Sequence, residues 1–285
     1  MIYICIAIIC SVIVSINLKL FKRYHTNAYQ AIVFNYPTAA LLCLIGFKPD
    51  FDVLPSTNEW ALFALIAALL LSIFYFIGQS VAHSGIILTA IAQRLSLIIP
   101  VLAAFFLFNE HGTTLKLAGL ALGFAALYAS KPSGKTGLKR SDNWYPFIVF
   151  LGTGLIDILF NLLTKLPVLS FTTSLFYIFI IAALFGFASL YVQYQKGVLK
   201  FEVKAAFAGV VLGLFNFGSI YFYIKALHLE SHRPSVVFSS LDIGVIFLGS
   251  LVGIALFKEK LNTLNRAGLL LALIAIVILN LPDAV

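Results

Sequence analysis

The sequence predicts an all-α membrane protein whose ten transmembrane helices form two inverted repeats of five. Three observations lead to this prediction: the composition, the spacing of the apolar runs and an internal repeat. Of the 285 residues, 61% are hydrophobic and 11% are charged, whereas a soluble domain carries about 25% charged residues. Most of the surface therefore faces lipid, and about ten helices of roughly 20 residues use up the chain and leave no soluble catalytic domain.

Ten apolar runs are long enough to cross a bilayer as helices. Five of them, at positions 2–18, 28–46, 60–82, 86–108 and 113–130, precede a polar stretch that contains Pro, Gly and Ser. Five more follow it, at positions 145–163, 168–194, 205–227, 234–257 and 263–281. Because such polar stretches are typical of loops, we expect a first repeat at 1–131, a linker at 132–143 and a second repeat at 144–285.

The two halves share residues at a constant shift of 149 positions. Glu110 matches Glu259, and Gly119 matches Gly268. These residue types are uncommon among spans, and the spacing between them is preserved, so an internal duplication is the natural interpretation. An odd number of helices in each half makes the second half enter the membrane from the opposite side, which is the inverted-topology repeat of many secondary transporters.

Lysine and arginine lie in the connections between the apolar runs, and they favour one side of the membrane. That side holds Lys19, Lys22, Arg23, Lys131, Lys135, Lys139, Arg140, Lys196, Lys200, Lys204, Lys258 and Lys260. The other side holds chiefly Lys48, Lys165 and Arg233. The positive-inside rule makes the first side cytoplasmic and puts both termini outside. It also accounts for the net charge of +8 without a nucleic-acid partner, because no basic stripe is interleaved with aromatic residues.

The layout resembles the drug/metabolite transporter superfamily, specifically its ten-helix EamA-type members, over essentially the whole chain. The residues that carry the resemblance are Pro100, Phe108, Glu110 and Gly119, with the second part of the pattern repeated at Phe257, Glu259 and Gly268. The resemblance implies an exporter or exchanger of amino acids, other metabolites or toxic compounds in the plasma (bacterial inner) membrane. It also implies that both termini lie in the cytoplasm, which is opposite to the charge count, so both orientations stay open. Small multidrug relatives carry a proton-binding glutamate in the first helix, but the run 2–18 has no acidic residue, so that mechanism is not carried over.

Three charged residues lie inside the apolar runs, where a charge is costly and marks a functional candidate. Arg94 is roughly 13 Å, and Asp157 and Asp242 are roughly 18 Å, from the side that the charge count makes cytoplasmic. One Arg against two Asp leaves a surplus negative charge, to be met by a proton, a cation or a substrate ammonium. A zwitterion would place its carboxylate on Arg94 and its ammonium on an Asp. The alternative is a structural ion pair between Arg94 and one Asp.

Polar residues in the same runs are further candidates for substrate binding. They are Gln93, Gln79, Asn35, Tyr36, Tyr75, Asn161, Asn216 and Tyr221. Hydrogen bonding between helices is the alternative role for each of them. Asp157, Asn161 and Lys165 recur every four residues, which predicts one shared helix face turned inward.

Several other residues have structural roles as the first expectation. Glu110 and Glu259 lie at helix ends, where capping explains them better than proton transfer does. Gly209 with Gly213 has the spacing of close helix packing within one chain. Pro37 and Pro100 free backbone carbonyls in mid-helix, which marks either broken helices near a site or simple kinks.

These observations predict a secondary transporter of small metabolites that works by alternating access, and not an enzyme. The expected partners are a small-molecule substrate, the lipid bilayer and a coupling proton or cation, with a monomer or a dimer as the oligomeric state. The three cysteines lack paired or metal-ligand spacing, so we expect no disulfide, metal or cofactor. The alternative is an intramembrane enzyme acting on lipid or peptide, although the sequence lacks a His-Glu-x-x-His helix and a matched nucleophile and base. A channel would need pore rings from repeated subunits.

Overall fold

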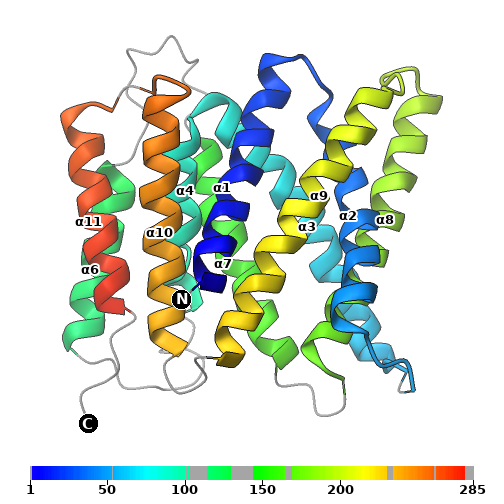
Figure 1. The fold of residues 1–285 in the computed structure, drawn as a ribbon, viewed down its shortest axis with the longest axis horizontal. Coiled ribbons are helices and arrows are strands. Elements are labelled where there is room, and N and C mark those ends of the chain that lie inside the picture. The colour runs from blue at the N-terminus through cyan, green and yellow to red at the C-terminus, as the bar shows by residue number, and fades with distance from the viewer. Residues whose placement is uncertain are drawn as a thin grey trace.

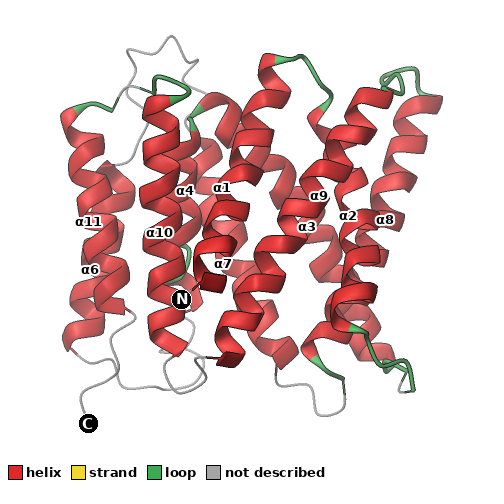
Figure 2. Cartoon of the chain, viewed as in Figure 1, coloured by secondary structure: helices red, strands yellow, loops and turns green. Residues whose placement is uncertain are grey.

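The computed structural model describes residues 2–52, 54–100, 102, 114–129, 144–164, 169–229, 234–259 and 261–279. Over this part of the chain, helices are the only regular secondary structure, and they stand side by side in one bundle (Figures 1 and 2). The prediction of an all-α fold is therefore confirmed for these residues. The linker 132–143, Glu110, Lys165 and Arg233 lie outside the described residues.

The helices begin and end close to the predicted apolar runs. They are α1 (Ile2–Arg23), α2 (Ala28–Phe47), α3 (Thr57–His83), α4 (Ile86–Leu95), α6 (Thr114–Ala129), α7 (Tyr145–Thr164), α8 (Phe171–Gln195), α9 (Val203–Leu229), α10 (Pro234–Ala255) and α11 (Thr263–Leu279). The largest difference is at α4, because the predicted run at 86–108 was expected to continue as helix, whereas α4 ends at Leu95.

Side-chain caps fix several helix starts. The Asn27 side chain accepts a hydrogen bond from the backbone of Gln30 at α2, and Ser170 does the same for Thr173 at α8. Ser56 and Glu59 form a reciprocal capping box at the start of α3. Each cap satisfies a backbone N–H that has no acceptor within its own helix.

The surface of the bundle has the character of a lipid-facing one. Six of the described helices (α1, α2, α3, α7, α8 and α9) are long and apolar enough to cross a membrane, and α4, α6, α10 and α11 contain shorter apolar segments. Large apolar side chains such as Leu184, Phe207, Phe247 and Leu270 are more than half exposed. Soluble monomers rarely expose so much apolar surface, and these features indicate a multi-pass membrane protein.

The helices of the two halves interdigitate instead of forming two separate bundles. α1 contacts α9 and α10, α2 contacts α8 and α9, and α3 contacts α7 and α8. α4 lies between α7 and α10, and α6 pairs with α11 at one edge of the bundle (Figure 1). A cavity in the middle of this bundle is therefore lined by both halves of the chain.

The close packing of α2 on α9 depends on two glycines. A Cβ at Gly209 would lie 2.4 Å from the Ala31 carbonyl oxygen, and one at Gly213 would lie 2.7 Å from the Asn35 carbonyl oxygen. The predicted role of Gly209 and Gly213 in packing within the chain is confirmed. Their contact brings the backbone of α2 next to that of α9 and holds Asn35 against the second half.

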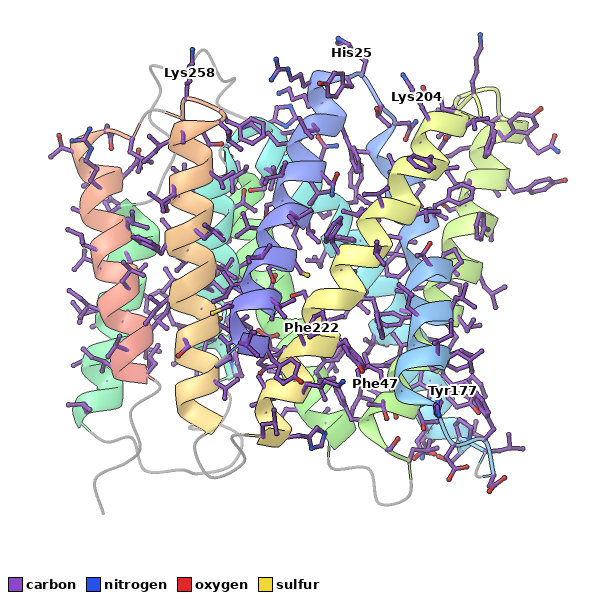
Figure 3. The ribbon with its side chains drawn as sticks, viewed as in Figure 1. His25, Phe47, Tyr177, Lys204, Phe222 and Lys258 are labelled. Atoms are coloured by element: carbon purple, nitrogen blue, oxygen red, sulfur yellow. The ribbon has the colours of Figure 1, made fainter. Side chains whose placement is uncertain are left out.

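Basic connections lie together at one end of the bundle. Lys258, His25 and Lys204 are at this end, while Phe47, Phe222 and Tyr177 lie toward the other (Figure 3). Lys19 and Lys22 donate to the carbonyls of Val81 and Ala82, the last turn of α3, at 3.0 and 3.1 Å. We call this end, with the C-terminal ends of α1 and α3 and the N-terminal end of α4, the basic end.

Candidate functional site

The fourth helix is interrupted in the middle of the bundle. α4 ends at Leu95, a turn follows at Ser96 and Leu97, and helical structure resumes at 98–100. Pro100 has no N–H to donate to the carbonyl of Ser96 four residues earlier, and its ring disfavours a straight helix there. The Ser96 carbonyl instead accepts from the backbone of Ile99 at 2.9 Å. Of the two predicted interpretations of Pro100, the broken helix is the observed one.

Arg94, in the last turn of α4, faces the second half of the protein. Its Nη1 donates to Oδ1 of Asp242 on α10 across 3.0 Å, and the two side chains are 24% and 15% exposed. The guanidinium and this carboxylate neutralise each other. The structural ion pair that was the alternative role of Arg94 is therefore formed, and its acidic member is Asp242.

Asp157, on α7, has a different environment. The Ser96 hydroxyl lies 3.1 Å from Oδ2 of Asp157 and also 2.6 Å from the Gln93 carbonyl. One hydroxyl carries one proton, so these two acceptors share it. Among the described residues, no basic side chain forms an ion pair with Asp157. Asp157 is therefore the carboxyl group of this cluster that no basic side chain of the described residues neutralises.

A cavity of about 270 Å³ opens beside these residues. Its polar lining comprises Ser11, Ser15, Tyr36, Gln93, Arg94, Thr153, Asp157, Asn216 and Ser219, and its apolar lining comprises Val14, Leu70, Ile73, Phe74, Ile77, Ile156, Phe160, Phe179, Ile220 and Val245. The lining comes from α1, α2, α3 and α4 and from α7, α8, α9 and α10. An apolar cavity with a few convergent polar groups is the usual form of a small-molecule site.

Several buried polar atoms at the cavity have no hydrogen-bond partner among the described residues. They are the Tyr36 hydroxyl, Thr153 Oγ1 and Arg94 Nε. Leaving such atoms unsatisfied costs free energy, so in a folded protein they mark places for water or ligand. Asn216 and Ser219 are already bonded across the bundle, to Asn35 at 3.1 Å and to Ser11 at 2.6 Å.

The structure brings some of the predicted site residues to the cavity and leaves others away from it. Arg94, Asp157, Gln93, Tyr36 and Asn216 line it. Asp242 does not line the cavity but accepts a hydrogen bond from the lining residue Arg94. Asn35 likewise accepts one from the lining residue Asn216.

Besides Asp242 and Asn35, four predicted residues do not line the cavity. Tyr75 packs edge-on against Tyr29, and Tyr221 packs against Phe47 and lies under the Lys225 ammonium. Gln79 is absent from the lining, and Asn161 has an exposed side chain. The inward face predicted for Asp157 and Asn161 together is therefore wrong for Asn161. A step of four residues turns a helix by about 40°, so Asn161 does not point in the same direction as Asp157.

Sequence reasoning missed the small hydroxyl residues of the site. Ser11, Ser15, Thr153 and Ser219 line the cavity, and Ser96 contacts Asp157. Serine and threonine are common in membrane helices, where their hydroxyls often bond to the backbone of the same helix. Neither their residue type nor their position therefore marked them as site residues. The spacing of Thr153 four residues before Asp157 was the one sign available.

Glu259 joins four helices at the basic end. Its carboxylate accepts from the backbone N–H groups of Ile86 and Ile87 at 2.8 and 3.3 Å, which caps α4, and lies 3.3 Å from Lys19 Nζ. Lys19 in turn donates to Val81 of α3. Gly85 has a φ of +98°, and a Cβ there would lie 2.8 Å from the carboxylate. Both the backbone conformation and the lack of space therefore require glycine at this position. The expected capping role of Glu259 is confirmed.

No group of three His, Cys, Asp or Glu side chains within the described ranges is arranged to hold a metal ion. Comparison with known proteins identifies a relative that aligns over nearly the whole chain. No family model matches the sequence. An uncharacterized protein of Haemophilus influenzae is 35% identical over an alignment of 288 positions, which covers 98% of this chain and 97% of the relative.

Proposed function

This chain belongs to the same family as the Haemophilus influenzae protein, and we propose that it is a secondary transporter that moves small ammonium-bearing solutes across the plasma membrane. In this proposal it is a ten-helix member of the drug/metabolite transporter superfamily, with two inverted five-helix repeats and one central binding site. The observation that carries the proposal is the cavity between the two halves, with Arg94 and Asp157 in its wall.

The pattern of helix contacts supports an inverted repeat. Matching the halves in chain order relates α1 to α7, α2 to α8, α3 to α9, α4 to α10 and α6 to α11. Under this exchange the contact of α1 with α9 becomes that of α7 with α3, and α1 with α10 becomes α7 with α4. Likewise α2 with α9 becomes α8 with α3, while the pairs α2 with α8, α4 with α10 and α6 with α11 map onto themselves. All of these contacts are present, as expected for two similar halves around a pseudo-two-fold axis.

The depth of the charged residues supports a midplane site. Arg94 is eight residues from the start of α4 and Asp157 twelve from the start of α7, which puts them about 12 and 18 Å from the basic end. Asp242 is thirteen residues before the end of α10, or about 20 Å from the same end. In a hydrocarbon core about 30 Å thick, these depths bracket the middle.

The contacts between helices at the basic end support alternating access. The Glu259 cluster ties α10 to α4 and α1 at the basic end, and Leu18, Val81 and Ile87, near that end of α1, α3 and α4, are buried. An interrupted helix next to the site is also typical of transporters that work in this way.

An intramembrane aspartyl enzyme would need Asp157 and Asp242 as a catalytic pair. The Arg94 contact to Asp242 weighs against this alternative, because a carboxylate held by a guanidinium is a poor proton carrier.

The proposal is tested by flux into proteoliposomes that contain the purified protein, using a panel of labelled amino acids and amines with and without a pH gradient. We expect saturable uptake or counterflow of at least one ammonium-bearing solute, reduced at least tenfold by Arg94→Gln. Asp52→Asn, a change in an exposed connection, is the matched control and should transport normally. Flux equal to that of empty liposomes for the whole panel would reject the function.

A further inference from the structure

We propose that the cavity selects primary monoamines with an apolar body over the corresponding zwitterionic amino acids, with Asp157 as the residue that binds the ammonium group. This inference rests on the proposed transport function and names the substrate class of its site.

The first step is the charge at the site. Arg94 and Asp242 form an ion pair at 3.0 Å, so they contribute no net charge. Within the described part of the chain, the hydrogen-bond partner of Asp157 is a shared hydroxyl from Ser96, so an ionised Asp157 gives the site a charge of −1. A monoamine brings the total to zero, whereas a zwitterion leaves it at −1. A net charge in the middle of a membrane costs several kcal/mol, so the monoamine is favoured.

The second step is the position that a carboxylate would need. A zwitterion at Asp157 would have to direct its carboxylate to Arg94, the basic residue in the described lining. Arg94 is held by Asp242, so the incoming carboxylate would compete with Asp242 and leave it without its partner. Removing one member of a buried ion pair leaves the other charge buried without a partner, which costs free energy. An amine without a carboxylate avoids this competition.

The third step is the number of acceptors near Asp157. Thr153 lies one helical turn before it on α7, and both side chains line the cavity. Thr153 Oγ1 is buried and has no partner among the described residues. A primary ammonium has three N–H donors, so it can bond to the carboxylate and to this hydroxyl together. A quaternary ammonium has no donor to offer, which makes a primary amine the better fit.

The fourth step is size. The cavity holds about 270 Å³, whereas a cavity of roughly 150 Å³ holds one benzene molecule. The additional volume accommodates a short aminoalkyl chain. The apolar part of the lining includes Phe74, Phe160 and Phe179, so it can cover the body of such a solute, which needs no hydrogen bonds.

The test compares solutes that differ only by a carboxylate: phenethylamine with phenylalanine, and isopentylamine with leucine. Equilibrium binding to the purified protein in nanodiscs is measured at pH 7 by calorimetry. We expect each amine to bind at least tenfold more tightly than its amino acid. Equal or tighter binding of the amino acids, or no binding of either amine, overturns the proposal.

Variants test the role of Asp157 separately. Asp157→Asn should weaken amine binding at least tenfold, and Thr153→Val several-fold, while Asp52→Asn leaves it unchanged. Unaltered amine binding by a folded Asp157→Asn protein also overturns the proposal. If Asp157→Asn does not fold, the comparison of matched solutes on the wild-type protein still decides. Amino-acid flux without amine binding would reject this inference and leave the transporter in place, whereas absence of all flux would reject the transporter.

Discussion

Nη1 of Arg94 lies 3.0 Å from Oδ1 of Asp242, and this contact joins α4 to α10 across the two halves of the chain. Arg94→Gln and Asp242→Asn should each destabilise the protein, because each leaves one charge unpaired. Since both side chains are partly exposed, we expect each single variant to lose about 2 kcal/mol of stability, less than the loss for a fully buried pair. Thermal unfolding of the purified variants measures the effect.

The double variant is the control for this pair. Arg94→Gln with Asp242→Asn removes both charges and should be more stable than either single variant. If the stability losses of the two single variants simply add up in the double variant, the two side chains do not interact.

Pro100→Ala should stabilise the fold and impair transport. The variant regains an N–H that can donate to the Ser96 carbonyl, and proline inside a helix costs about 3 kcal/mol. A continuous helix would move Ser96 away from Asp157 and change the wall of the cavity. We expect a higher melting temperature together with a tenfold or greater loss of flux in proteoliposomes.

Pro146→Ala is the matched control for Pro100. Pro146 lies in the first turn of α7, where a missing N–H costs nothing because no acceptor precedes it. Its replacement should leave flux unchanged. Normal flux in Pro100→Ala would mean that the interruption of α4 has no role in transport.

Gly213→Ala should separate α2 from α9. The new Cβ would lie 2.7 Å from the Asn35 carbonyl oxygen and 2.7 Å from Thr38 Cβ, and backbone atoms cannot move aside locally. Overpacking of this kind costs about 1–3 kcal/mol. Among the described residues, the new Cβ of Gly218→Ala, on the same helix, would meet the Cys10 side chain at 3.3 Å, so this variant should be nearly neutral. Similar melting temperatures for the two variants would argue against close packing at Gly213.

Glu259→Gln should loosen the basic end. An amide accepts more weakly than a carboxylate from the α4 N-terminus, and it loses the charge that faces Lys19. The readout is labelling of Ser15→Cys, which lines the cavity, by a membrane-impermeant maleimide from the basic side. Cys5, Cys10 and Cys43 are replaced beforehand. We expect faster labelling in the Glu259→Gln protein.

Glu202→Gln provides the comparison for Glu259. Glu202 lies near the same end and forms a more exposed pair with Lys204 at 3.6 Å, so its replacement should not change labelling of Ser15→Cys. Equal labelling rates with and without Glu259→Gln would exclude this residue as a closing contact.

Most of the fold could be predicted because hydropathy is a local property of the chain. The starts of α2, α7 and α10 match the starts of the predicted runs at 28, 145 and 234. The length of a span is set by the bilayer, so counting apolar residues finds the helices without any knowledge of their neighbours. The end of α4 at Leu95 was missed, because Pro100 acts on a carbonyl four residues earlier and the apolar run continues through it.

The candidate site could be predicted only in part. Arg94, Asp157 and Asp242 were identified because charges are rare in spans and their depth follows from their distance to a helix end. Depth alone does not give direction around the helix axis. Asn161 and Tyr75 share the apolar context of the true lining residues, yet Asn161 is exposed and Tyr75 packs against Tyr29.

The sequence by itself determined the helices, their order, the depth of each charge and the glycines that allow close packing. Only the tertiary structure decided that Arg94 pairs with Asp242 and that Asp157 lies beside a cavity without a basic partner among the described residues. The physical reason is that helix formation depends on hydrogen bonds and solvent along one segment. The neutralisation of a charge depends instead on which faces of distant helices meet. Small residues such as Gly209 and Gly213 determine which helix faces can pack closely.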